Sequence, residues 1–136
     1  MLSLYQLPGV YTICRLAPED TLPDWATQGA FWSVTRAPEE LSVVCEAHLV
    51  PEGVRREGEW GMLSVQGPLD FSLCGILSQL TEPLAQAGIP VFVVSTFDTD
   101  HILIRTADLA RAVETLRSAG YTVETGGSPM TRSHEG

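Results

Sequence analysis

Two turn segments carry the residue types with the clearest potential for ligand chemistry. Residues 67–70 (GPLD) lead into a segment with helical apolar spacing, and the first amides of a helix lack partners and attract anions. Residues 97–100 (FDTD) bring two carboxylates to the end of a strand-like segment. An anion site and a cation site together are what a free zwitterionic amino acid requires. Asp98 and Asp100 are also common turn residues, so a purely structural role stays open.

The composition excludes several other kinds of chemistry. The 136 residues include 17 acidic and 8 basic side chains, a net charge of −9, and all eight basic residues are arginine. Without lysine there is no Schiff-base or P-loop chemistry. An acidic chain lacks the basic face that binds nucleic-acid phosphates, and no apolar run approaches the roughly 18 residues of a membrane span. The sequence therefore predicts neither a nucleic-acid nor a membrane partner.

The cysteines and histidines form no metal or catalytic pattern. The cysteines are Cys14, Cys45 and Cys74, an odd number without a C-x-x-C pair, which predicts buried reduced thiols without disulfide or zinc. The histidines share no metal-ligand spacing, and His101 follows Asp100 in a strand, so their side chains should face opposite ways. With no nucleophile–base pair or phosphate loop, we expect no enzymatic activity, metal or cofactor. The start of the chain carries no basic leader, which predicts a cytoplasmic protein.

The second half of the chain follows the pattern β-α-β-β-α-β. Four runs rich in apolar, aromatic or β-branched residues predict strands at 60–66, 91–96, 101–105 and 121–124. Two intervening segments repeat apolar residues three or four positions apart and predict helices. The first helix can begin at Asp70 or Ser72 and end at Gly88, and the second can run from Asp108 to Gly120. This order is the ferredoxin-like arrangement, an antiparallel sheet with both helices on one face.

The first half repeats this plan with little helix. Its predicted strands are residues 11–16, 31–35 and 41–45, and residues 23–27 leave room for one or two helical turns. The segment TRAPEELSV from Thr35 matches TFDTDHILI from Thr96 in the spacing of its threonine, acidic and apolar residues. We expect the tryptophans to fill the core where the helix is missing. They are Trp25, Trp32 and Trp60.

The repeat predicts an α+β fold of tandem ferredoxin-like (βαββαβ) units with antiparallel sheets, the first unit poor in helix. We expect a truncated unit at residues 1–58, a complete unit at 59–125 and a flexible tail at 126–136, which is rich in Gly, Ser and Pro. A unit of about 60 residues alone makes a marginal core, so further pairing into a homodimer is expected.

The second half of the chain also resembles a known family. Residues 67–120, which contain GPLDFSLCGILSQLTEPLAQAGIPVFVVSTFDTDHILI, closely resemble the ACT domain of CASTOR-like proteins, in particular the small bacterial proteins made of tandem ACT units. The first half supports the match with WSVTR at residues 32–36 and PEELSVV at residues 38–44. The resemblance covers roughly residues 5–125. It implies that residues 1–58 are a truncated ACT-like unit and residues 59–125 a complete ACT unit. ACT domains are regulatory modules that bind amino acids between paired units.

The resemblance also implies a ligand site around the FDTD turn. Asp100 stands where the CASTOR-type sensors carry an aspartate that pairs with the cationic group of the ligand. Thr96 and Phe97 match the two residues that precede that aspartate and line the pocket. The facing unit would contribute backbone near Pro90 and Val91.

Three residues at the start of the first predicted helix complete the implied site. Cys74 matches a ligand-contacting cysteine, whereas Leu73 replaces a glutamate and Asp70 replaces a glycine. Asp70 adds bulk and negative charge beside the expected carboxylate site, and Leu73 removes an acid. These two differences set the site apart from that of the arginine-binding sensors.

The sequence thus predicts a regulatory protein that binds an amino acid or a similar small zwitterion between paired ACT units. The alternative is an ACT-type module for protein interaction or assembly that has no ligand and acts through an unidentified protein partner. In either case an exposed sheet edge could pair by strand addition.

Overall fold

The computed structural model describes residues 2–66 and 75–126, and its chain divides into two compact units. Unit 1 comprises Met1–Pro8 and Gly61–Gly136, and unit 2 comprises Gly9–Trp60. These units differ from the predicted division between residues 58 and 59 chiefly at the start of the chain, which belongs with the second half. The assignment of two ACT-like domains to the two halves stays a prediction.

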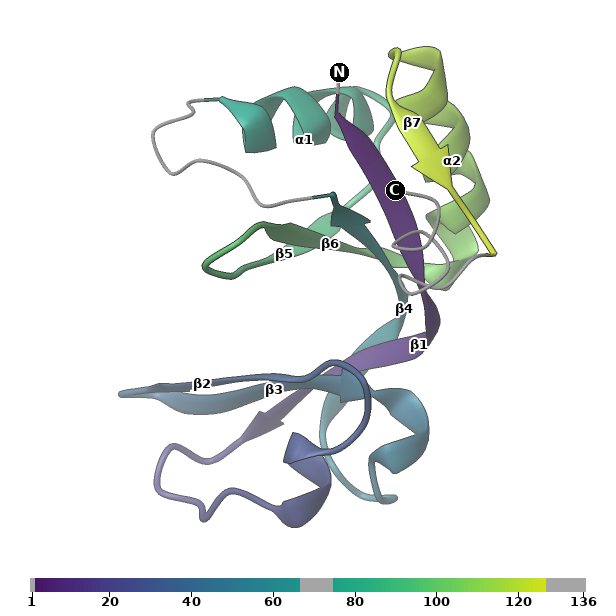
Figure 1. Cartoon of the computed structure of the whole chain (residues 1–136). Coiled ribbons are helices and arrows are strands. Elements are labelled where there is room, and N and C mark those ends of the chain that lie inside the picture. Colours follow the sequence, from purple (N-terminus) through teal and green to yellow (C-terminus); the bar gives the residue numbers. More distant parts are fainter. Residues whose placement is uncertain (1, 67–74, 127–136) are drawn as a thin grey trace. The chain divides into compact units, whose positions relative to one another are not determined.

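Unit 1 contains a βαββαβ run with one additional strand (Figure 1). Its elements are β1 (Ser3–Leu16, as far as Pro8), β4 (Arg56–Val65, from Gly61), α1 (Ile76–Gln86), β5 (Val91–Ser95), β6 (Asp100–Arg105), the short 3-10 helix η3 (Thr106–Asp108), α2 (Leu109–Ser118) and β7 (Thr122–Glu124). The strand order is β7-β1-β4-β6-β5. Strands β5 and β6 pair antiparallel, and β7 is parallel to β1. The predicted α+β, ferredoxin-like fold class is confirmed, and the early part of β1, from Ser3 to Pro8, adds an unforeseen strand between β4 and β7.

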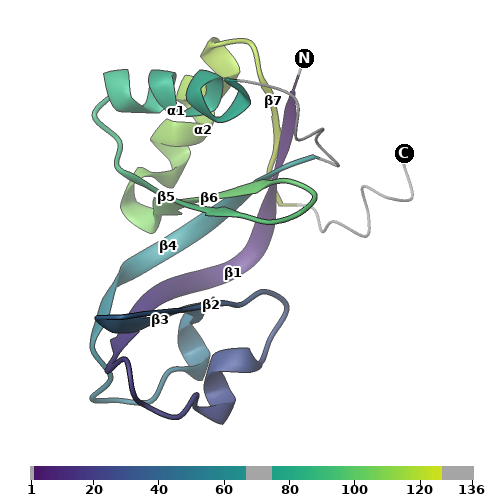
Figure 2. The same ribbon diagram turned by 90° about the vertical axis from the view of Figure 1, so that its left-hand side faces the viewer.

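Both helices of unit 1 cover the same face of its sheet (Figures 1 and 2). Alternate strand residues point to opposite faces, and Leu63 of β4 and Ile102 of β6 belong to one buried cluster. Leu80 and Leu84 of α1 and Leu116 of α2 complete the centre of this cluster. Full burial of such a side chain contributes about 1.5–3 kcal/mol. The helices therefore supply much of the apolar burial that stabilises unit 1.

Helix α1 begins later in the chain than its sequence pattern predicts. Gly75 occupies the N-cap position with φ 76°, and Ile76 is the first helical residue. The predicted helix start at Asp70 or Ser72 is therefore wrong. Glycine adopts this left-handed conformation without steric cost because it lacks a Cβ. As a consequence, the unpaired amides of the first turn begin at Ile76.

Pro83 lies inside α1 and leaves one helical carbonyl without its usual donor. Proline has no N–H to donate to the carbonyl four residues earlier, which belongs to Gln79. The hydroxyl of Tyr121 donates to this carbonyl oxygen at 3.0 Å. Tyr121, which directly precedes β7, thus replaces the missing hydrogen bond and connects the segment between α2 and β7 to α1.

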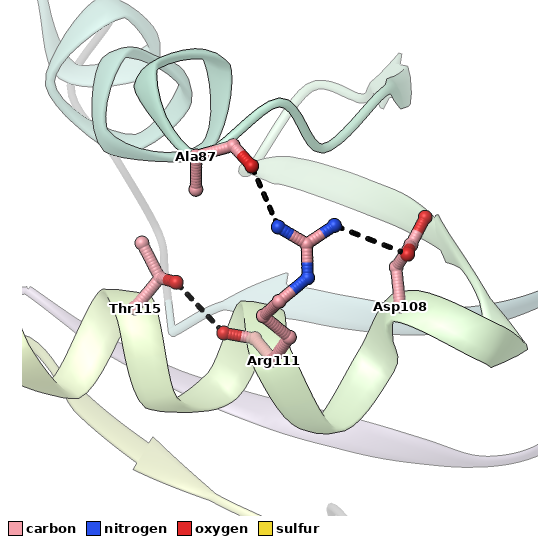
Figure 3. A network of polar contacts seen from close by, with 4 residues as sticks. All are labelled: Ala87, Asp108, Arg111 and Thr115. Atoms are coloured by element: carbon pink, nitrogen blue, oxygen red, sulfur yellow. Dashed lines mark hydrogen bonds and ion pairs between the residues drawn. The ribbon is translucent and has the colours of Figure 1, made fainter.

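Arg111 of α2 connects the two helices directly (Figure 3). Its Nη1 donates to the Ala87 carbonyl oxygen, just after α1, at 2.6 Å. Its Nη2 lies 3.3 Å from Oδ1 of Asp108, and the Thr115 hydroxyl donates to the Arg111 carbonyl at 2.8 Å. Arg111 therefore holds the end of α1 against the first turns of α2.

Unit 2 repeats the strand plan with short 3-10 helices in place of α-helices. Its elements are β1 from Gly9, η1 (Asp24–Thr27), β2 (Ser33–Ala37), β3 (Glu40–Glu46), η2 (Ala47–Leu49) and β4 as far as Trp60. The strand order is β2-β3-β1-β4, and β3 pairs antiparallel with both of its neighbours. The strands and the single short helix predicted for the first half are all found. That this unit is itself an ACT unit stays a prediction.

The core of unit 2 is smaller than that of unit 1. Its buried cluster consists of Cys14, Ala26, Val43, Cys45 and Val50. Trp25 packs against this cluster and Trp60 is buried. Trp32 is 45% exposed, so the prediction that it fills the core is wrong. It precedes Ser33, the first residue of β2, and therefore lies beyond the strand ladder that carries the core.

The fold brings two cysteines of unit 2 together. Cys14 is paired with Val43, and Cys45 is paired with Thr12, so the two cysteines lie diagonally on neighbouring strands and on one face. Both are buried free thiols. A hydrogen bond from Cys45 lowers the pKa of Cys14, and the same contact together with burial raises the pKa of Cys45. Cys74 lies outside the described residues.

Candidate functional site

The FDTD segment forms a tight turn between β5 and β6. The Thr96 N–H donates to the Thr99 carbonyl oxygen at 2.8 Å, and the Thr96 hydroxyl donates to the same oxygen at 3.1 Å. The hydroxyl also lies 3.4 Å from the Thr99 N–H, from which it can accept. Thr96 therefore shapes the turn that presents the acidic residues, as threonine commonly does.

Asp100 is the predicted site residue with the most defined geometry. It is the first residue of β6, stands opposite Ser95 of β5, and accepts a hydrogen bond from the Ser95 hydroxyl at 2.6 Å on Oδ1. Asp100 is partly buried. No residue in the described part of the chain binds its second oxygen, Oδ2. The carboxylate is thus oriented through one oxygen and open through the other.

The hairpin tip and the end of β4 lie at the same edge of unit 1. The Thr99 hydroxyl donates to the Val65 carbonyl oxygen at 2.9 Å, and Val65 is the last residue of β4. Phe97 is 81% exposed at the tip, and Asp98 beside it is also exposed. The sequence alone does not show whether the GPLD and FDTD turns lie at the same edge of the unit. The Thr99–Val65 hydrogen bond places the FDTD turn beside the end of β4, the strand that leads to residue 67.

Pro90 and Val91 lie at the other end of β5. Val91 is paired with Ile104, whereas Ser95 is paired with Asp100. At about 3.3 Å per residue, the four steps from Val91 to Ser95 span roughly 13 Å. One copy of unit 1 therefore cannot place Pro90 and Asp100 around the same small ligand. This separation is compatible with the expectation that Pro90 and Val91 come from a facing unit.

The remaining predicted residues, Asp70, Leu73 and Cys74, lie outside the described residues. Sequence reasoning did not single out Ser95 or Thr99, although each has a clear positional signal. Ser95 comes directly before the turn and Asp100 directly after it, so the two residues are cross-strand neighbours. The side chains of such neighbours lie on the same face of a hairpin. Thr99 lies inside the FDTD turn itself.

A buried polar pair on β4 and β6 was also missed by sequence reasoning. The Ser64 hydroxyl and Nδ1 of His101 are 2.6 Å apart. Ser64 is fully buried, and burial lowers the pKa of His101, an effect that nearby Asp100 opposes. Ser64 and His101 alternate with the apolar residues that face the helices, so the pair lies on the opposite face of the sheet.

Two cavities that are bordered by residues within the described ranges lie away from Pro90, Val91 and the β5–β6 turn. One of about 470 Å³ in unit 1 is bordered by α2 residues such as Leu109 and Val113, together with Gln6 and Thr125. Another of about 190 Å³ lies in unit 2. In the described ranges, 2–66 and 75–126, no cluster of three or more His, Cys, Asp or Glu is placed to hold a metal ion. Over the same residues, no helix is long and apolar enough to span a membrane.

Known proteins match both parts of the chain. A family model described as ACT domain matches residues 55–118, and a second model, which describes an N-terminal domain, matches residues 9–53. The crystal structure of protein Atu0741 from Agobacterium tumefaciens has a TM-score of 0.87 and 40% sequence identity, and the match covers 93% of this chain and 94% of that chain. The chain belongs to the same family as Atu0741. Its ACT match extends from β4 to α2 and includes the β5–β6 hairpin.

Two further similarities involve proteins that are much longer than the matched region. The human protein named cytosolic arginine sensor for mTORC1 subunit 1 is 39% identical over 59 residues, which are 43% of this chain and 18% of that protein. Aspartate kinase from Clostridium acetobutylicum has a TM-score of 0.60 at 12% identity, over 85% of this chain and 34% of that chain. The kinase likeness shows a shared fold alone. This chain therefore combines a segment that matches the ACT domain model with an N-terminal segment that matches the second model.

Proposed function

We propose that this protein is a non-enzymatic regulatory protein that binds an amino acid or a similar small zwitterion at the β5–β6 hairpin. The observation that carries the proposal is the state of Asp100, whose Oδ1 is held by Ser95 at 2.6 Å while Oδ2 has no partner in the described ranges. An oriented carboxylate with one open oxygen suits the ammonium or guanidinium group of a ligand. The ACT match and the similarity to an arginine sensor support an amino acid as that ligand.

The opposite charge of the ligand would be met by backbone amides. The Thr99–Val65 contact keeps the hairpin tip beside the end of β4, from which the chain leads toward α1. Amides at a helix start carry partial positive charge and bind carboxylates without a basic side chain. In this proposal Asp70, Leu73 and Cys74 belong to the carboxylate side of the site.

A second copy of the chain would complete the site and make the protein a homodimer. Strand β5 is the last strand in the order of unit 1. Antiparallel pairing of β5 with its own copy, centred on Val93, would bring Val91 of one copy beside Ser95 of the other. Pro90 and Val91 would then reach the Asp100 region, which they cannot do within one copy. A scattering mass of one chain at micromolar concentration would contradict this part of the proposal.

The alternative function, an interaction module without ligand, is favoured by one observation. Phe97 is 81% exposed at the hairpin tip. Large aromatic side chains are enriched at protein interfaces, so the tip could dock on a protein partner instead. In that case Phe97→Ser would abolish partner binding, and Asp100→Asn would have a much smaller effect.

A thermal-shift screen against the twenty amino acids tests the proposal directly. A ligand that binds only the folded state raises Tm, by an amount equivalent to about 2.7 kcal/mol at a concentration of 100 times Kd. We expect one chemical class of amino acid to raise Tm of the full chain, and to lose this effect in Asp100→Asn. A screen in which no amino acid raises Tm would favour the interaction module.

A further inference from the structure

Unit 2 contains a cavity that is rich in arginine for so acidic a chain. The cavity has a volume of about 190 Å³ and is bordered by Arg15, Glu40, Ser42, Arg55, Arg56 and Glu57. Three of the eight arginines of a chain with net charge −9 thus meet at one place. The lining holds three guanidinium groups and two carboxylates, which leaves one net positive charge.

The backbones of two of these arginines are joined by a hydrogen bond. The Arg15 N–H donates to the Arg55 carbonyl oxygen at 3.0 Å, where β1 runs beside the start of β4. Both side chains border the same cavity, and like charges that lie close together are destabilising. An anion bound between the two guanidinium groups would offset this repulsion, because each group would be attracted to the anion.

The arginines differ in how many donors they have already used. Arg15 Nη2 donates to the Glu39 carbonyl oxygen at 2.9 Å, and Arg56 Nη2 donates to the Pro51 carbonyl oxygen at 2.5 Å. For the Arg55 side chain, the structure shows no hydrogen bond or ion pair to any described residue. A guanidinium presents five N–H donors in a planar fork, so Arg55 has its full set available and Arg15 retains most of its own.

We propose that this cavity binds a small organic oxyanion, held by Arg55 and Arg15. The planar guanidinium fork matches both carboxylate and phosphate oxygens. Ser42, which is paired with Arg15 across β1 and β3, adds a hydroxyl donor beside them. The volume is below the roughly 300–1,000 Å³ of pockets for drug-sized ligands, so the ligand is expected to be small. The site lies in unit 2 and is independent of the function proposed for the hairpin.

Calorimetric titration of the full chain with two probes, succinate and inorganic phosphate, tests this site. We expect saturable binding of at least one probe, and the tighter one shows whether a carboxylate or a phosphate is preferred. Arg55→Gln should weaken binding about 10-fold or more, because a charge-assisted hydrogen bond is lost. Arg55→Lys keeps the charge but loses the fork, and should fall between wild type and Arg55→Gln.

Arg36→Gln is the matched control. It removes the same charge from unit 2, but the Arg36 guanidinium donates to the Pro18 and Asp20 carbonyl oxygens and does not border the cavity. Circular dichroism of each variant confirms that it is folded. Binding that falls equally in Arg36→Gln and Arg55→Gln would reflect general charge attraction and overturn the proposal. The absence of binding by both probes at millimolar concentration would overturn it as well.

Discussion

Units 1 and 2 share a plan of antiparallel strands but cover their sheets in different ways. In unit 1, two amphipathic helices bury a leucine-rich cluster, whereas unit 2 has only short 3-10 helices over a core that contains two thiols. The polar groups differ as well, because unit 1 presents an open carboxylate at a hairpin and unit 2 presents arginines around a cavity. The strand pattern therefore defines each sheet, while the segments between strands decide the depth of the core and the chemistry at the surface.

The largest expected effect concerns the two cores. Leu84 of α1 and Val43 of β3 are both fully buried. Leu84→Ala should lower the free energy of unfolding by about 2–5 kcal/mol. Val43→Ala removes fewer carbon atoms from a smaller cluster and should cost about 1–2.5 kcal/mol. Urea denaturation of both variants measures the difference. A larger loss for Val43→Ala would contradict the view that the helix-covered core is the more stabilising one.

A medium effect is expected where α2 packs directly on the sheet of unit 1. A Cβ added at Gly61 would lie 2.7 Å from Cδ2 of Leu109, well inside van der Waals contact. Gly61→Ala should therefore force Leu109 to shift and cost about 1–3 kcal/mol. The matched test is Gly61→Ala in a Leu109→Ala background, where the clash is absent. If Gly61→Ala costs the same in both backgrounds, close helix packing is not the reason for this glycine.

The sequence predicted the strands better than it predicted the ends of elements. The β-branched runs and the turn at Thr96 are local signals, so the β5–β6 hairpin is found where it is expected. The start of α1 depends on the left-handed conformation of Gly75, and helical spacing alone does not reveal this. The early part of β1 was missed because its partners among the described strands, β4 and β7, lie far away in the sequence.

The candidate sites show the same division between local and distant information. Asp100 could be found from the FDTD turn and the family resemblance, because both are local patterns. The contact of Cys14 with Cys45 and the backbone hydrogen bond between Arg15 and Arg55 join residues far apart in the sequence, so they could not be found in this way. Non-local pairs become visible only once the register of the strands is known.

The smallest expected effect is a pH dependence that differs between the Ser64–His101 pair of unit 1 and the Cys14–Cys45 pair of unit 2. Burial lowers the pKa of His101 below its ordinary value of 6.5. The unfolded chain then binds the proton more readily than the native one, so stability is highest above pH 6.5 and falls as the pH decreases through that value. In unit 2, the raised pKa of Cys45 places the titration of its thiol in the alkaline range.

Urea unfolding at several pH values between about 5 and 8 measures the His101 contribution. Relative to wild type, His101→Gln should flatten the decrease in stability on acidification. His48→Gln serves as the control, because the His48 side chain is 71% exposed. Equal slopes for wild type and His101→Gln would show that the Ser64–His101 pair does not titrate with folding.

The most direct test of the proposed function compares the two aspartates of the hairpin. With the best amino acid from the thermal screen, calorimetric titration should show that Asp100→Asn weakens binding about 10- to 150-fold, since it removes one charge-assisted hydrogen bond. Asp98→Asn removes the same charge from an exposed neighbour and should change the affinity much less. Tm of the unliganded protein should stay nearly unchanged in both variants. Equal effects of the two substitutions on binding, or a large loss of Tm in unliganded Asp100→Asn, would instead assign Asp100 a structural role in the turn and contradict the proposed site.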